Sequence, residues 1–166
     1  MAVEDGTSAF QTLVATIDYP MFVVTTAAEG ERAGCLVGFA TQCSIDPLRF
    51  LVCLSKRNHT LRVADRAEVL IVHFLGVDDL DIASLFGENT GDEVDKFARC
   101  RWEPGPGAAP VLSAGRGWVA GRILDRLDLG DHLGFLAEPL AGEARDGDGP
   151  QLGFQGVRHL DPGHEA

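Results

Sequence analysis

The sequence predicts a mainly β protein: an antiparallel barrel, closed or nearly closed, with a few short helices between its strands. Six or seven short segments have strand character, turn-forming residues join most of them as hairpins, and the helical segments are brief. The 166 residues suit one domain with one core. We expect that domain to span residues 1–166, with frayed ends at 1–6 and 161–166.

The N-terminal part predicts one helix and one hairpin. Thr7 or Ser8 can cap a helix that runs to Ile17, and its apolar residues recur on one face, which we expect to cover the end of a sheet. That face contains Phe10, Leu13, Val14 and Ile17. Residues 21–26 and 33–39 then form two apolar strands across a turn at 27–30.

The stretch from Gly38 to Thr60 organises the rest of the chain. Asp46-Pro47 separates two alternating segments and predicts a turn with proline at its second position, so the two strands fold back on each other. Residues 55–60 then emerge close to residues 41–44. Asn58 or Thr60 can cap a short helix that follows.

The remaining elements follow from local composition. Residues 69–75 predict a buried strand, residues 78–86 a helix that Gly87 ends, and residues 95–99 one or two helical turns. Residues 102–110 predict an irregular loop, because three prolines lack amide donors and glycines break any ladder. Residues 118–127 and 132–140 form a second hairpin, and residues 151–157 a last strand.

Composition narrows the function classes. A net charge of −11 and a pI near 4.7 argue against a nucleic-acid partner. Apolar runs have only strand length, and no secretory signal is visible, so we expect no membrane association and a cytoplasmic location. The four cysteines have no metal or redox spacing, and we interpret them as reduced core thiols: Cys35, Cys43, Cys53 and Cys100.

Familiar chemical motifs are missing from the sequence. No usable dinucleotide fingerprint or phosphate loop of the nucleotide-triphosphatase type occurs, and the histidines never fall at a metal-ligand spacing, so we expect no metal. His73 lies in an apolar strand and is interpreted as structural. The cluster Ser55-Lys-Arg-Asn-His-Thr60 taken alone fits either a solvated turn before a helix cap or a phosphate site built from hydroxyls, amides and cations.

From about Phe10 to Leu140 the chain resembles the flavin reductase-like family. The matching features are residues 21–26, the strand-turn-strand 38–54 with its Ser-Ile-Asp-Pro, the cluster 55–60, Asp95-Lys-Phe97 and Gly130-Asp-His132. The resemblance implies an antiparallel, Greek-key-like split β-barrel that binds FMN, with FAD as a further option, and forms a homodimer. It also implies NADH or NADPH as co-substrate and a partner monooxygenase or other acceptor for the reduced flavin.

The resemblance further implies site residues. Residues 38–44 would line the flavin ring and ribityl chain, residues 55–60 would receive the phosphate, and His132 would lie near the flavin and the nicotinamide as the catalytic residue. The expected cofactor-binding residues are Gly38, Phe39, Ala40, Thr41, Cys43, Ser44, Ser55, Lys56, Asn58, Thr60 and Phe97.

The leading hypothesis is therefore a flavin reductase that passes hydride from NAD(P)H to the flavin. Its alternative is a flavin-binding module that stores or relays electrons with little nicotinamide activity, because residues 151–160 depart from the family's usual aromatic and glycine-arginine-tyrosine ending. A third option is a barrel without cofactor that acts as an interaction dimer.

Overall fold

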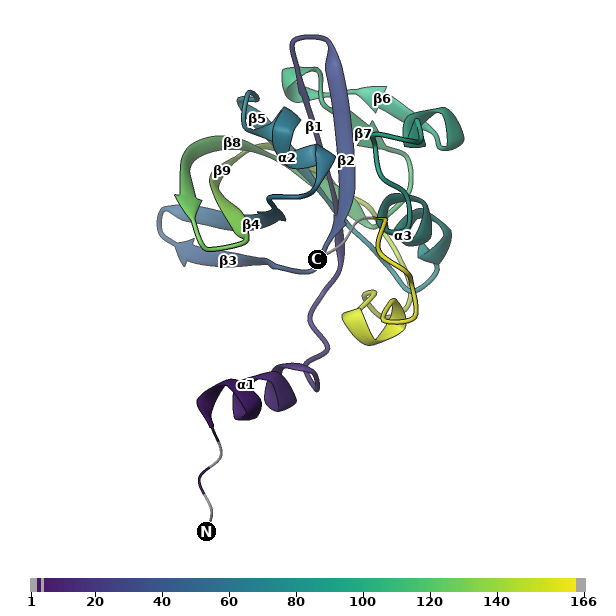
Figure 1. Cartoon of the computed structure of the whole chain (residues 1–166). Helices are drawn as coiled ribbons and strands as arrows, with labels where there is room; N and C mark the ends of the chain where they lie inside the picture. The colour runs from purple at the N-terminus through teal and green to yellow at the C-terminus, as the bar shows by residue number, and fades with distance from the viewer. Residues whose placement is uncertain (1–2, 4, 164–166) are drawn as a thin grey trace.

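The computed structural model describes residue 3 and residues 5–163; the expected fraying of residues 1, 2, 4 and 164–166 lies outside this part. Seven strands form one antiparallel sheet in the order β2-β1-β5-β8-β9-β4-β3. The sheet curls into a barrel (Figure 1), and its edge strands β2 and β3 are not paired with each other. The predicted fold class, a mainly β split barrel with short helices, is confirmed.

The elements have the following bounds. The large sheet contains β1 (Phe22–Ala28), β2 (Glu31–Val37), β3 (Ala40–Ile45), β4 (Leu48–Ser55), β5 (Val69–Phe74), β8 (Gly117–Asp128) and β9 (His132–Ala144). A separate ribbon contains β6 (Trp102–Pro104) and β7 (Pro110–Leu112). The helices are α1 (Gly6–Val14), α2 (His59–Ala64), α3 (Leu80–Gly87) and the 3-10 turns η1 (Lys96–Arg99), η2 (Pro106–Ala108) and η3 (Phe154–Gly156).

The three predicted hairpins of the large sheet are present. Glu29 and Gly30 turn β1 into β2 with positive φ angles of 52° and 80°. Ile45 pairs with Leu48, so Pro47 is the third residue of its turn, not the second as predicted. The long strands β8 and β9 carry two register shifts, which bend them so that β8 pairs with β5 while β9 pairs with β4.

The core lies on both faces of β1, because this strand is paired on both sides, with β2 and β5, and has apolar side chains on each face. Phe22 and Val24 point into the barrel, where they pack with residues of β2, β4, β5 and β9. Val23, on the opposite face, packs beneath α3 with Phe86 and Leu112. This two-sided burial makes β1 the strand that fixes the barrel to its helical cover.

His73 joins three strands on the covered face, which confirms its structural interpretation. It is fully buried; its Nδ1 lies 3.0 Å from the Val23 carbonyl and its Nε2 accepts the Leu112 amide at 2.9 Å. Because Nε2 accepts, the ring is neutral and Nδ1 carries the proton. Burial lowers the pKa of His73 to about 4.

Helix α1 differs from its prediction. Asp5 caps it, and it buries none of its residues: Phe10 is 66% exposed and Leu13 67% exposed. Figure 1 shows the helix projecting away from the barrel, so it does not cover the end of the sheet in this chain. Its apolar face is present, but the described part of the chain leaves most of that face exposed. No helix in the described part of the chain is long and apolar enough to cross a membrane.

Two C-terminal predictions were also wrong. Residues 102–110 are not wholly irregular, because β6 and β7 form a short ribbon whose Pro104 and Pro110 face each other at its loop end. At this end of the ribbon the hydrogen bond runs from the Gly105 amide to the Ala109 carbonyl at 2.8 Å. The ribbon therefore needs no amide hydrogen from either proline. Residues 151–157 make only single bridges, Gly76 to Gln151 and Pro20 to Gly153, followed by η3.

Candidate functional site

A cavity of about 210 Å³ lies where the end of β2, the start of β3, the end of β4 and the start of β9 meet. Five expected site residues line it, from three separate parts of the chain: Gly38, Phe39, Ser55, Asn58 and His132. The pairing of Ser55 with His132 in the β4–β9 ladder explains this convergence, since it places residues 55–60 beside the hairpin of β8 and β9. We call this space the β2–β4 cavity.

The entry of β3 forms one wall of the β2–β4 cavity. The Cys53 amide donates to the Phe39 carbonyl at 2.8 Å, which holds this backbone against β4. A Cβ atom on Gly38 would lie only 2.4 Å from the Tyr19 ring, so glycine is needed for the close approach of the two segments. The phenyl ring of Phe39 is 55% exposed at this wall.

The N-terminus of α2 forms the floor of the β2–β4 cavity. The Asn58 side chain accepts the Thr60 amide at 2.9 Å and caps the helix, as predicted. Thr60 itself is 1% exposed, and its hydroxyl faces the buried Cys35 thiol rather than the surface. Burial raises the pKa of Cys35, and the Thr60 hydrogen bond opposes that rise. Among these two residues, Asn58 alone lines the cavity.

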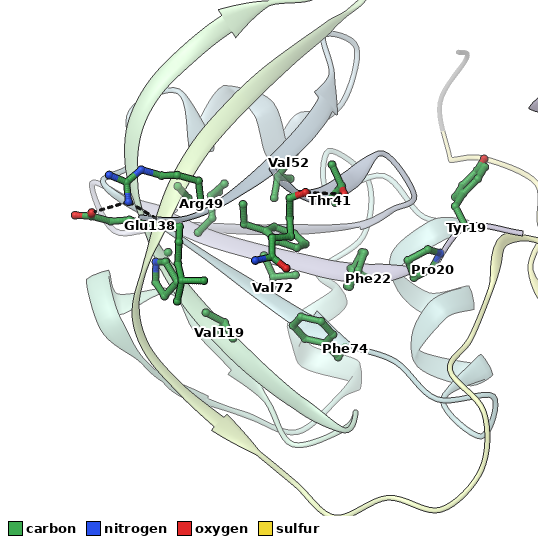
Figure 2. Close-up of a pocket in the computed structure, with 18 of the residues that line it drawn as sticks. Tyr19, Pro20, Phe22, Thr41, Arg49, Val52, Val72, Phe74, Val119 and Glu138 are labelled. Carbon is green, nitrogen blue, oxygen red and sulfur yellow. Dashed lines mark hydrogen bonds and ion pairs between the residues drawn. The ribbon is translucent and has the colours of Figure 1, made fainter. Parts of the chain in front are cut away.

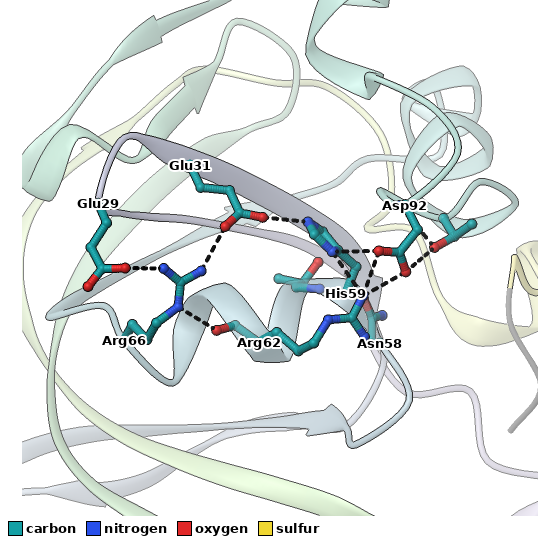
Figure 3. A network of polar contacts seen from close by, with 9 residues as sticks. Glu29, Glu31, Asn58, His59, Arg62, Arg66 and Asp92 are labelled. Atoms are coloured by element: carbon teal, nitrogen blue, oxygen red, sulfur yellow. Dashed lines mark hydrogen bonds and ion pairs between the residues drawn. The ribbon is translucent and has the colours of Figure 1, made fainter.

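Figure 3 shows an ionic network that holds the outer side of α2. The ring of His59 lies between two carboxylates, with Nε2 3.2 Å from Glu31 and Nδ1 3.0 Å from Asp92. Arg62 binds Asp92 at 2.6 Å, and this contact lowers the pKa of Asp92. Arg66 extends the network to Glu31 at 2.7 Å. The network ties α2 to β2 and to the segment before η1, so it fixes the helix start that carries Asn58.

His132 begins β9 and is only partly exposed. Its Nδ1 lies 2.7 Å from a carboxylate oxygen of Asp131, and this hydrogen bond lowers the pKa of Asp131. The centroid of its ring lies 5.2 Å from that of Phe39. The Asp131 contact therefore sets the orientation of the imidazole at the mouth of the β2–β4 cavity.

Lys56 lies just outside the cavity and already has an anionic partner. Its Nζ donates to Asp128 at 2.7 Å, and the bond lowers the pKa of Asp128. Both side chains are largely exposed. Because exposed ion pairs contribute little net free energy, a stronger anion can replace this carboxylate.

The structure does not bring every expected residue to this cavity. Phe97 is 6% exposed and packs edge-on against Phe86 and Trp102 in the core beneath α3. Cys43 is exposed at the β3 bulge, which corrects its interpretation as a core thiol, and Ser44 follows it in the same irregularity. None of these three side chains lines the β2–β4 cavity.

A larger cavity of about 630 Å³ opens on the other side of β3 and contains Ala40 and Thr41. Figure 2 shows apolar side chains around it, among them Phe22, Val72 and Phe74. Arg49 and Glu138 form an ion pair at 3.3 Å beside them. This barrel cavity is mostly apolar, unlike a site that must recognise a phosphate.

Two aromatic residues of the β2–β4 cavity were not predicted. Tyr19 and Phe154 line it, with ring centroids 4.7 Å apart and planes at 20°. Tyr19 is the one tyrosine of the sequence and stands directly before an apolar strand, a weak signal. Phe154 gives no local signal, because its contact depends on a segment 135 positions away.

Comparison with known proteins gives a family match. A family model described as "Flavin reductase like domain" matches residues 14–161. An FMN reductase (NADH) from Methylorubrum extorquens is 28% identical over 131 residues, which cover 79% of this chain and 63% of that protein. The reductase component of 4-hydroxyphenylacetate 3-monooxygenase from Escherichia coli is 26% identical over 141 residues, covering 83% of this chain and 82% of that one.

A solved structure shares the fold. The flavin reductase HpaC complexed with NADP⁺ superposes with a TM-score of 0.77 at 20% identity, covering 87% of this chain and 90% of that one. At this identity the likeness concerns the fold.

Proposed function

Because the chain belongs to the flavin reductase-like domain family, we propose that it passes hydride from NAD(P)H to a flavin in the β2–β4 cavity. The family match and the names of the relatives confirm the expected enzyme class, a flavin oxidoreductase with FMN and a nicotinamide co-substrate. The observation that carries the choice of site is the convergence of Gly38, Phe39, Ser55, Asn58 and His132 on one cavity.

The residues present fit a flavin with a phosphate. The cavity offers a backbone wall at the start of β3, a hydroxyl at Ser55 and an amide side chain at Asn58, with the Lys56 cation just outside. Helix α2 has only six residues, so we assign phosphate binding to Ser55 and Lys56 rather than to the helix end. Thr60 is buried and its hydroxyl contacts Cys35, so we assign it a structural role at the start of α2.

When bound, the flavin supplies the hydride acceptor, and the protein supplies orientation. The backbone wall at Gly38 and Phe39 would lie beside the flavin ring, while Ser55 and Lys56 would hold the phosphate end. His132, oriented by Asp131 at 2.7 Å, would contact the nicotinamide and fix its distance to the flavin. No side chain needs to act as an acid or base in a direct hydride transfer.

A second copy of the chain is part of this proposal. The apolar face of α1, with Phe10 and Leu13 exposed, and the apolar barrel cavity both lack a partner surface within the described chain. A homodimer would bury both, because large apolar patches favour association. This supports the homodimer expected from the family resemblance.

We further propose that the reduced flavin serves a monooxygenase or another acceptor, as the name of the Escherichia coli relative suggests. The four cysteines have no disulfide partner in the described chain, which supports a reducing compartment such as the cytoplasm.

The test is an absorbance spectrum followed by a nicotinamide titration. We expect the purified protein to bind FMN and, with FMN present, to oxidise NADH or NADPH well above the protein-free rate. If FMN binds but nicotinamide absorbance falls no faster than without protein, the electron-transfer module is correct instead. If no flavin binds, the interaction dimer is correct.

A further inference from the structure

Four aromatic rings follow one another along the β2–β4 cavity: Phe154, Tyr19, Phe39 and His132. Phe154 stacks on Tyr19 at 4.7 Å and 20°, whereas Phe39 meets Tyr19 at 6.0 Å and 54° and meets His132 at 5.2 Å and 49°. The first contact is nearly parallel, and the other two are tilted. The series therefore has a stacked part and a loosely packed part.

The stacked pair is fixed by the backbone of two distant segments. The Phe154 amide donates to the Tyr19 carbonyl at 2.8 Å, and the Gln155 amide donates to the carboxylate of Asp18 at 2.8 Å. The edge of the Tyr19 ring packs on Gly38, where no side chain would fit. Residues 151–157, which failed to form a strand, thus set the place of the Tyr19 ring.

The ring of Phe39 is held much less firmly. Its backbone is bonded to β4, but the side chain is 55% exposed and its aromatic contacts are the two tilted ones. With Phe39 in this position the cavity measures about 210 Å³, below the range of roughly 300 to 1,000 Å³ that is usual for small-molecule sites. A flavin ring system therefore requires more room than this arrangement of Phe39 leaves.

We propose that Tyr19 and Phe154 form a fixed stacking surface for the flavin ring, and that Phe39 covers this surface until the flavin displaces it. The inference rests on the proposed function and adds two positioning residues to it. Once Phe39 turns outward, one face of the flavin ring lies against Tyr19 and the other faces His132, the side assigned to the nicotinamide. Phe154 acts through Tyr19, by holding its plane.

The experiment measures the binding of riboflavin, which has the ring but no phosphate, by stopped-flow quenching of flavin fluorescence. Removing a cover and removing a support have opposite effects. Phe39→Ala is expected to raise the association rate and the affinity about 3- to 10-fold, and Phe154→Leu to lower the affinity by a similar factor. Phe154→Tyr retains an aromatic face and is expected to bind like the unmodified chain.

Ile45→Ala is the matched control, because this residue is 79% exposed on β3 and lines neither cavity. Its affinity is expected to stay within about 2-fold. Circular dichroism checks the fold of each variant, and Tyr19→Leu replaces Phe154→Leu if that variant does not fold.

Weaker riboflavin binding by Phe39→Ala would overturn the covering role of Phe39. Unchanged binding by a folded Phe154→Leu or Tyr19→Leu variant would overturn the stacking surface. Both results leave the proposed function intact, since the unmodified chain still binds flavin. Absence of flavin binding by the unmodified chain would refute the proposed function and this inference together.

Discussion

The buried histidine of β5 makes the stability of the protein depend on pH. In the unfolded chain His73 takes up a proton near pH 6.5, whereas in the folded protein it resists protonation until about pH 4. Desolvation is the main cause, because the ring is fully buried. Protonation of Nε2 would also break the hydrogen bond that this nitrogen accepts from the Leu112 amide. The unfolded state therefore binds more protons between these values, and folding stability falls as the pH is lowered through this window.

The size of the effect follows from the two pKa values. Each pKa unit corresponds to about 1.4 kcal/mol, so His73 alone removes about 2.5 kcal/mol of unfolding free energy between pH 7 and pH 4.5. That is a large share of the roughly 5 to 15 kcal/mol typical of a domain.

The assay is urea unfolding at both pH values, followed by tryptophan fluorescence at one protein concentration. His73→Gln keeps a hydrogen-bond donor and an acceptor but does not titrate. The unfolding free energy that this variant loses between pH 7 and pH 4.5 is therefore expected to be about 2.5 kcal/mol smaller than the loss in the unmodified protein. His159→Gln changes an exposed histidine and is the control. Its unfolding free energy is expected to change with pH as that of the unmodified protein does. Equal pH dependence in the unmodified protein and the His73 variant would refute the reasoning.

Three further predictions concern the site and the dimer. Lys56→Ala is expected to weaken FMN binding about 5-fold and to leave riboflavin binding unchanged. Asp128→Asn releases Lys56 from its 2.7 Å ion pair and is expected to tighten FMN binding about 2-fold. Equal effects of these variants on FMN and riboflavin binding would contradict the phosphate assignment. His132→Ala is expected to slow single-turnover hydride transfer roughly 10- to 100-fold with a smaller change in flavin affinity, and an unchanged rate removes His132 from the mechanism. Leu13→Glu places a charge on the apolar face of α1 and is expected to raise the dimer dissociation constant roughly 30-fold. Light scattering during gel filtration measures the mass, and an unchanged mass would contradict a role of α1 in the dimer.

Features governed by near neighbours were predictable from the sequence. The turn at Glu29-Gly30, the turn at Asp46-Pro47 and the Asn58 cap each depend on residues a few positions apart, and all three are present. The apolar alternation likewise located the strands of the large sheet, although the ends of β8 and β9 extend beyond their predicted limits.

Features that depend on distant segments were not predictable. Residues 151–157 have strand-like composition, but they bridge Pro20 on one side and Gly76 on the other, and proline cannot donate to extend a ladder. Phe97 belongs to a motif that resembles the family's, yet its ring packs in the core beneath α3. The apolar face of α1 was identified correctly while its contact surface was not.

The sequence by itself determined the order of the strands of the large sheet along the chain, the Asn58 cap and the chemical types at the proposed site, because turn geometry and side-chain chemistry are local properties. The tertiary structure decided which of those residues meet. The β4–β9 ladder places Ser55 beside His132, and the bond from Phe154 to Tyr19 completes the cavity wall. Such contacts depend on strand register and on the burial of both faces of β1, which are set by the packing of the whole chain rather than by any one segment of it.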